Sequence, residues 1–229
     1  MNASFLTPSL QETRWGIRYL LFELLFLPSL LSALNNLLGA QWNAAWLNVL
    51  FYGINFAATA FLFRHFLRQT FAALSGRILH ILKTAAILWL IYWVVMLLEG
   101  YFMAVLFPDF INVNDAGIAA MAADEFVLMA VSTIILVPVT EELLFRGALF
   151  GGLSQRHPRA AWGISVLCFC LVHVYAYIGL YPWDTLLLCM VQYIPAGLIL
   201  AEAYRRTGSI LTPILIHAAV NFLGIFAMR

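Results

Sequence analysis

The sequence predicts an all-α protein, a polytopic bundle of about seven transmembrane helices with a cytoplasmic N-terminus. Two observations carry this prediction. First, 64% of the 229 residues are hydrophobic and only 10% are charged, whereas a soluble domain has about 25% charged residues. Second, the apolar residues gather in runs of roughly 20, the length of helix that crosses the hydrocarbon core of a bilayer. We therefore expect an integral, multi-pass protein of the cell membrane, in contact with the lipid bilayer.

The basic residues justify the helices in order and orient them. The expected helices are residues 16–38, 43–63, 84–107, 125–152, 161–178, 185–204 and 209–228. The basic residues that flank them all fall on one side of the membrane, and they are Arg14, Arg18, Arg64, Arg68, Arg77, Lys83, Arg156, Arg159, Arg205 and Arg206. The connections on the other side, 39–42, 108–124 and 179–184, contain no Lys or Arg. By the positive-inside rule, the N-terminus is cytoplasmic and the C-terminus lies outside.

Charge and cysteine content exclude other classes of protein. A net charge of +1 gives no basic field for nucleic acid, so no nucleic-acid partner is expected. Cys168, Cys170 and Cys189 all lie in apolar runs, where an odd number of cysteines is no disulfide framework. We interpret them as small hydrophobic residues. No pattern in the sequence predicts an oligomeric state.

Polar side chains from three of the expected helices lie at one depth. Counted along the helix axis, Glu141 is about 16 Å and His173 about 18 Å from the cytoplasmic ends of their helices. His217 is about 12 Å and Asn221 about 18 Å from the cytoplasmic end of the last helix. Polar residues are rare and costly within a membrane, and they usually mark functional sites. Their shared depth therefore predicts one polar site in the cytoplasmic half of the bilayer.

Helix geometry predicts partners within this layer. Glu142 and Arg146 are four residues apart, so they share a helix face and can pair. Such pairing offsets part of the cost of burying both charges. Glu141 points about 100° away around the helix and lacks that partner. Pro138 removes a backbone hydrogen bond one turn earlier, so we expect a kink that opens space for water beside Glu141.

The residue types in this layer limit the chemistry they can perform. A carboxylate near an imidazole, Glu141 with His173, can take a proton from water and return it to a leaving group. A second imidazole and an amide, His217 and Asn221, can donate hydrogen bonds to the oxyanion of a tetrahedral intermediate. This set is the minimum equipment for hydrolysing an amide bond in a water-accessible pocket of the membrane.

Three motifs on successive helices resemble a known family. They are "EELLFR" at 141–146, "FCLVH" at 169–173 and "HAAVN" at 217–221. Their order and placement resemble the CPBP family of ABI type, which includes CAAX prenyl proteases and bacteriocin-processing enzymes. The resemblance covers about residues 125–225. It predicts a catalytic core at 121–229, and it leaves 1–120 as N-terminal transmembrane helices with no assigned role. Eight spans are common in the prenyl protease branch, and this chain is expected to have seven.

The resemblance implies an intramembrane endopeptidase of the glutamate type. By this analogy, Glu141 and His173 activate the attacking water, while His217 and Asn221 stabilise the oxyanion. The ion pair in the first motif supports that geometry. The expected substrate is a membrane-associated or lipid-modified protein or peptide, and the expected process is trimming of C-terminal sorting signals or peptide maturation. The site would be reached from the cytoplasmic half of the bilayer.

The same residues leave alternatives open. No cofactor is expected, but two histidines and a glutamate could instead hold zinc with water as the fourth ligand; the absence of an HExxH motif argues against this. A proton-coupled transporter also uses buried Glu, His and Arg, although the internal repeats typical of transporters are missing. A third alternative is a non-catalytic immunity or binding protein. Glu23, placed near the cytoplasmic end of the first helix, is expected to snorkel toward the membrane surface.

Overall fold

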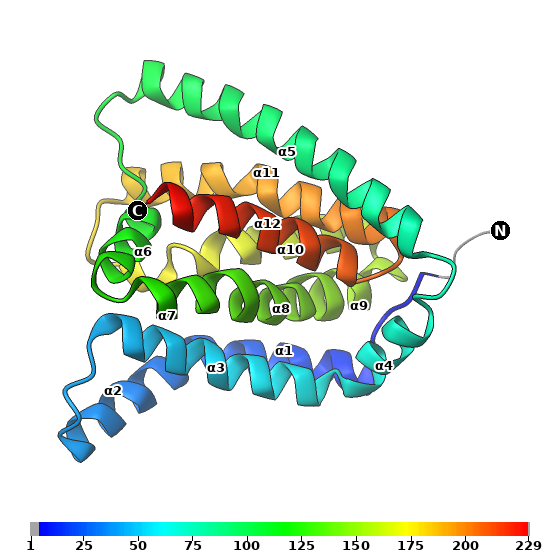
Figure 1. The fold of residues 1–229 in the computed structure, drawn as a ribbon, viewed down its shortest axis with the longest axis horizontal. Coiled ribbons are helices and arrows are strands. Elements are labelled where there is room, and N and C mark those ends of the chain that lie inside the picture. The colour runs from blue at the N-terminus through cyan, green and yellow to red at the C-terminus, as the bar shows by residue number, and fades with distance from the viewer. Residues whose placement is uncertain (1–4, 229) are drawn as a thin grey trace.

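The computed structural model describes residues 5–228, which fold as helices joined by short connections (Figure 1). The α-helices are α1 (Leu10–Leu25), α2 (Leu27–Leu38), α3 (Ala44–Leu62), α4 (Arg64–Ala72), α5 (Ile78–Leu106), α6 (Val113–Asp124), α7 (Phe126–Val131), α8 (Val137–Glu141), α9 (Gly152–Ser154), α10 (Pro158–Val172), α11 (Trp183–Thr207) and α12 (Leu211–Ala227). Two π-helical segments, η1 (Ser132–Leu136) and η2 (Glu142–Gly151), join α7, α8 and α9 into one continuous helix. A 3₁₀ turn, η3 (Tyr175–Tyr177), follows α10.

The described helices include four that are long and apolar enough to cross a membrane. They are Ala44–Leu62, Ile78–Leu106, Phe126–Ser154 and Trp183–Thr207. A fifth exists if α1 and α2, which meet at a 48° bend, form one span. The remaining two apolar helices, α10 and α12, have 15 and 17 residues, and a helix of that length is shorter than the roughly 30 Å hydrocarbon core. The chain is thus an integral, multi-pass membrane protein with four or five candidate spans.

Capping residues define the helix ends on the side that carries the basic residues. Ser9 and Glu12 form a capping box at the start of α1, where each side chain satisfies a backbone N–H of the other residue. The second oxygen of the Glu12 carboxylate accepts a hydrogen bond of 2.9 Å from the backbone N–H of Phe66 in α4. Helix α11 ends at Gly208, whose φ of 59° lies in the left-handed region that favours glycine. The Glu12 carboxylate thus caps α1 and also joins the start of α1 to α4.

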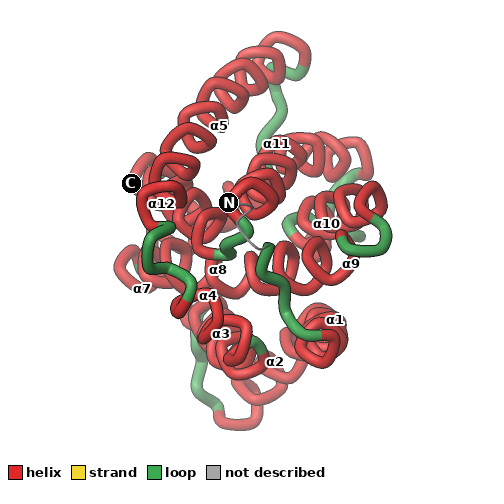
Figure 2. Tube along the Cα trace, turned by 90° about the vertical axis from the view of Figure 1, so that its right-hand side faces the viewer, coloured by secondary structure: helices red, strands yellow, loops and turns green. Residues whose placement is uncertain are grey.

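The helix from Phe126 to Ser154 occupies the centre of the bundle, as the view along the helices shows (Figure 2). It packs against α1, α3, α10, α11 and α12. Half of its most apolar window is buried, against 17% for Ala44–Leu62, so protein rather than lipid surrounds it. On the opposite side of α11 and α12, helix α5 covers the bundle (Figures 1 and 2). The motif with three charged residues is therefore carried by the best-shielded helix.

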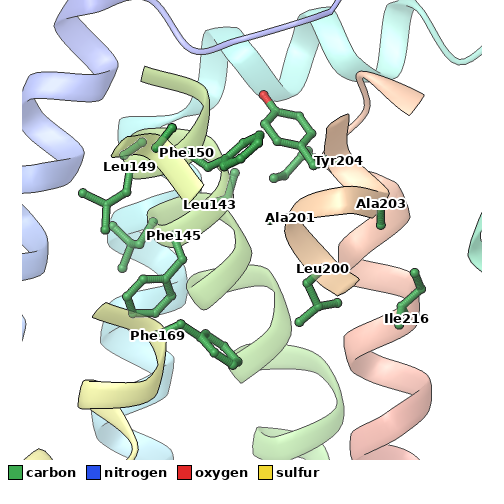
Figure 3. Close-up of a cluster of buried hydrophobic side chains, with 14 of the residues drawn as sticks. Leu143, Phe145, Leu149, Phe150, Phe169, Leu200, Ala201, Ala203, Tyr204 and Ile216 are labelled. Carbon is green, nitrogen blue, oxygen red and sulfur yellow. The ribbon is translucent and has the colours of Figure 1, made fainter. Parts of the chain in front are cut away.

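One hydrophobic cluster joins this central helix to its neighbours (Figure 3). Phe145 and Phe150 of η2 meet Phe169 of α10 and Tyr204 of α11, with ring centroids 5.6 and 6.3 Å apart for the Phe145–Phe169 and Phe150–Tyr204 pairs. The cluster also includes Leu20, Phe63, Phe66, Ala85 and Leu88 from the first 120 residues. The N-terminal helices and the motif-bearing helices therefore share one packed core.

Pro138 does not break the central helix. The backbone stays helical from Phe126 to Ser154, and Pro138 lies in α8 between the π-helical segments η1 and η2. A π-helix bonds each N–H to the carbonyl five residues earlier, and such wide turns are found mostly at functional sites. Pro138 therefore follows directly after the α8 start at Val137 and the widened turn η1, and the helix continues through it.

Candidate active site

The side chains predicted to form a site line one cavity of about 500 Å³. Glu141 comes from α8, His173 from the residue that ends α10, and His217 and Asn221 from successive turns of α12. Glu141 and His217 are both buried, with 6% of each exposed. Residues that are separated by as many as 80 positions in the sequence thus meet because α10 and α12 both pack beside the central helix.

Glu142 and Arg146 form the predicted ion pair outside this cavity. Arg146 Nη1 donates to Glu142 Oε1 at 3.0 Å, and both side chains are fully buried. Arg146 also donates to the carbonyl of Gly197 at 3.2 Å and lies 4.2 Å from the ring centroid of Phe169. The arginine therefore links η2 to α10 and α11 through one charge.

The Glu142 carboxylate also contacts His217, the first residue of the "HAAVN" motif. His217 Nδ1 lies 2.8 Å from Glu142 Oε1, a contact that the spacing of the motifs did not predict. A carboxylate can only accept, so Nδ1 carries the proton that it shares with Glu142. This contact orients the ring of His217 and leaves Nε2 as its other nitrogen. Glu142 thus acts on His217, while Glu141 lies in the cavity wall.

Glu141 has no charged partner, as helix geometry predicted. One carboxylate oxygen accepts a hydrogen bond of 3.3 Å from the hydroxyl of Tyr52 in α3. The other oxygen is buried and has no hydrogen-bond partner among the described residues. A buried oxygen with a free lone pair is the acceptor that a water molecule or a substrate N–H would use.

His173 is fixed in one tautomer by its own helix. Its Nδ1 lies 2.7 Å from the carbonyl oxygen of Phe169, and because a carbonyl can only accept, Nδ1 carries the proton. Nε2 of the neutral ring is then a proton acceptor. The ring stacks on Tyr193 with centroids 4.0 Å apart and planes 26° apart, and Phe169 lies on it at 4.7 Å. Position and tautomer are both set before any substrate binds.

Asn221 is held by the π-helical turn before Pro138. The N–H of Val137 donates to the carbonyl of Ser132, five residues earlier. The next carbonyl, that of Thr133, would pair with residue 138, but proline has no N–H. Asn221 Nδ2 fills this vacancy and donates to the Thr133 carbonyl at 2.8 Å. Pro138 thus frees the acceptor that positions Asn221 and leaves the second amide N–H for another partner.

Tyr193 and a short polar network complete the wall of the cavity. The Tyr193 hydroxyl donates to Asp115 Oδ1 at 2.9 Å and accepts from Asn114 Nδ2 at 3.0 Å, which ties α6 to α11. Burial raises the pKa of Asp115, and the hydrogen bond from Tyr193 opposes that shift. Tyr52 and Tyr193 had no distinctive sequence signal, because single tyrosines in apolar runs are typical of the aromatic belt.

Glu23 is placed differently from the sequence-based expectation. It lies in α1 shortly before the bend to α2, is only 5% exposed, and lines the same cavity as Glu141. It does not snorkel to the surface. Helix α1 begins at Leu10, so about 20 Å of helix separates Glu23 from that end. An acid within an apolar run was the signal that could have marked it as part of the site.

The arrangement of possible metal ligands does not fit a zinc ion. Across residues 5–228, no three His, Cys, Asp or Glu side chains are grouped closely enough to hold a metal ion. The Glu142 carboxylate contacts His217, but it already forms an ion pair with Arg146. We therefore derive no chemical step through a metal.

Taken together, the fold and the cavity define a helical membrane protein with a buried acid, two imidazoles and an amide around one space. Comparison with known families specifies the class further. Residues 123–223 match the model of the type II CAAX prenyl endopeptidases, Rce1-like, and form a domain of this CPBP family. The resemblance seen in the three motifs is confirmed. The family of this model is described as one of CAAX prenyl endopeptidases.

A curated relative matches over a similar length. The chain is 30% identical over 95 residues to the UPF0177 protein YxdF of Lactococcus lactis subsp. lactis (strain IL1403). The match covers 42% of this chain and 47% of the relative, so the chain spans about half the length of that protein. No solved structure matches the chain significantly.

Proposed function

We propose that this protein is an intramembrane endopeptidase in which Glu141 and His173 activate a water molecule. The observation that carries the proposal is the convergence of Glu141, His173, His217 and Asn221 on one cavity. In each side chain, one atom is held by a contact within the protein, and another nitrogen or oxygen is available to water or substrate. The substrate is a peptide bond in a membrane-associated or lipid-modified protein or peptide.

The water molecule would bind between the unpartnered oxygen of Glu141 and Nε2 of His173. As its oxygen attacks the carbonyl carbon of the substrate, one of its protons passes to this acid–imidazole pair. The C–O bond forms, and the carbonyl becomes a tetrahedral oxyanion. When the C–N bond breaks, the proton moves to the departing nitrogen, so the pair returns to its starting state. Tyr52, through its hydrogen bond to Glu141, orients the carboxylate for this transfer.

The oxyanion would be stabilised from α12. The free amide N–H of Asn221 donates to it directly, held in place by the contact to Thr133. His217 can donate from Nε2 as an imidazolium, and the carboxylate of Glu142 balances that charge. Arg146 fixes the orientation of the Glu142 carboxylate. Glu142 and Arg146 are therefore supporting residues.

The topology in the membrane belongs to the same proposal. Seven crossings place the N-terminus in the cytoplasm and open the site toward the cytoplasmic half of the bilayer, with α10 and α12 as short spans inside the bundle. Residues 121–229 supply the chemistry, and residues 1–120 supply part of the cavity wall. Trimming of C-terminal sorting signals and maturation of peptides are the processes that fit a substrate entering from the bilayer.

The test uses purified protein in detergent with two probe sets, prenylated C-terminal peptides and single-span peptides, read by mass spectrometry. Glu141→Gln and His173→Ala are expected to lower cleavage by about 10²–10⁴-fold, the usual contribution of a positioned acid–base group. Glu202→Gln, which changes an acid in a surface ion pair, is the matched control and should cleave normally. Full cleavage by both site variants would refute the assignment.

Two further arms separate the alternatives. A chelator added to the same assay distinguishes zinc chemistry from acid–imidazole chemistry, and we expect no loss of cleavage. The variants are also reconstituted in liposomes that report proton flux. Flux that depends on Glu141, with none of the probe peptides cut, would support a transporter and contradict the endopeptidase proposal.

A further inference from the structure

The wall of the cavity carries acidic side chains that are not matched by basic side chains of the described residues. Three carboxylates line it, from Glu23, Asp115 and Glu141. The described residues that line it include no Lys or Arg. A cavity whose ionisable wall groups are acids and imidazoles attracts a cation, and low-dielectric walls strengthen the attraction.

Among the three carboxylates, that of Glu23 has no hydrogen-bond partner within residues 5–228. Glu141 accepts from Tyr52, and Asp115 accepts from Tyr193. The oxygen Oε2 of Glu23 is buried and unpartnered, and the residue is only 5% exposed. A buried oxygen without a donor is an acceptor that a ligand group can use, and a cationic donor would bind it most strongly.

The basic residues nearest in sequence do not supply that partner. Arg14 and Arg18, on the same helix, are exposed and line a separate surface hollow beside Trp15. Arg146, the fully buried arginine of the central helix, is paired with Glu142. A cationic group that pairs with Glu23 would therefore come from a ligand rather than from these arginines.

The rest of the wall indicates what carries that charge. Apolar side chains, among them Leu31, Phe51, Met121 and Met129, line the same cavity. Its volume of about 500 Å³ is more than three times the roughly 150 Å³ of an apolar cavity that binds benzene. The space suits several adjacent side chains of a peptide, most of them apolar and one of them cationic.

We propose that Glu23 is a subsite for a Lys or Arg side chain of the substrate, in a peptide segment that is otherwise apolar. This inference rests on the proposed function and assigns it a substrate class. The ammonium or guanidinium donates to Oε2 of Glu23, while the neighbouring peptide bond lies against Glu141 and His173. A segment of this kind is found where a membrane-spanning stretch ends in basic residues.

The first test compares paired peptides that differ at one position. Apolar peptides carry either lysine or norleucine, which keeps the aliphatic chain without the charge, at successive positions on both sides of the cut. At the position that reaches Glu23, the wild type should cleave the lysine peptide about ten- to a hundredfold more efficiently, the usual effect of a charged hydrogen bond. In Glu23→Gln this ratio should fall to near one. Glu99→Gln, an acid in α5 that does not line the cavity, should keep the wild-type ratio.

The second test measures binding without catalysis. Decylammonium and decanol are added to the purified protein, and the rise in thermal stability is recorded for the wild type and Glu23→Gln. Preferential stabilisation by decylammonium that disappears in Glu23→Gln is expected. Glu23→Gln should fold, because the exchange is isosteric and breaks no hydrogen bond.

Failures of the two proposals can be told apart. Cleavage with a lysine-to-norleucine ratio that Glu23→Gln leaves unchanged would overturn the cationic subsite and leave the endopeptidase intact. Equal stabilisation of both proteins by decylammonium would overturn it as well. Absence of cleavage, with decylammonium binding that depends on Glu23, would contradict the endopeptidase and support the cation site.

Discussion

Replacing Arg146 by methionine should destabilise the protein strongly, because it leaves a buried carboxylate behind. Arg146 and Glu142 are both fully buried and lie 3.0 Å apart. Removing one partner of such a pair costs about 3–5 kcal/mol. Methionine fills much of the same volume, so the loss reports the stranded charge rather than a cavity. The remaining contact of Glu142, to His217 at 2.8 Å, compensates only if His217 becomes an imidazolium.

The double variant Glu142→Gln/Arg146→Met separates stability from catalysis. Neither charge is then stranded, and replacing a buried ion pair by neutral residues is often neutral for stability. We expect the free energy of unfolding to recover to within about 2 kcal/mol of the wild type. Cleavage should stay low, because His217 no longer has a carboxylate to balance its charge. Stability and activity would thus respond differently to the same pair of changes.

The assay is reversible unfolding by SDS titration in mixed micelles, followed by circular dichroism, with peptide cleavage measured on the same samples. Glu202→Gln breaks surface ion pairs to Arg205 and Arg206 and should cost less than about 1 kcal/mol. The reasoning is refuted if the free energy of unfolding of Arg146→Met lies within about 1 kcal/mol of the wild-type value. It is also refuted if the double variant is no more stable than Arg146→Met.

Two further outcomes test how the site residues are positioned. Pro138→Ala restores a backbone N–H that competes with Asn221 for the carbonyl of Thr133. The free energy of unfolding should not decrease. Because Asn221 loses its anchor, kcat should fall at least about tenfold. Unchanged kcat would show that proline does not position the amide. Tyr193→Phe keeps the ring stacked on His173 and should retain most of kcat, whereas Tyr193→Leu should lose about tenfold in kcat with little change in KM. Equal kcat values for these two variants would contradict a positioning role for the ring.

Much of the fold could be predicted because apolar runs and charge placement report on the bilayer directly. Each expected run corresponds to a helix or a helix pair of the structure. Four of these helices are long and apolar enough to be spans, or five if the bent pair α1 and α2 is one span, whereas α10 and α12 are shorter. At Pro138 the helix stays continuous, and the proline follows the widened turn of η1.

Only some contacts of the candidate site could be predicted from the sequence. The Glu142–Arg146 pair follows from spacing within one helix and is confirmed. The contact between Glu142 and His217 could not be predicted, because helix spacing does not say which face of α12 meets the central helix. Tyr52, Tyr193 and Glu23 come from other helices and carry no motif. Their role in the cavity wall depends on packing across the bundle.

By itself, the sequence determined that this protein lies in a membrane and roughly where its long helices run, and it predicted which polar residues share a depth. These properties depend on hydrophobicity and on helical rise, which are local and one-dimensional. Only the tertiary structure decided that Glu142 holds His217, and that Glu23 lies in the cavity wall with an oxygen that no described residue partners. The reason is physical: rotation of each helix about its axis is set by packing against its neighbours, and that rotation selects the faces that meet.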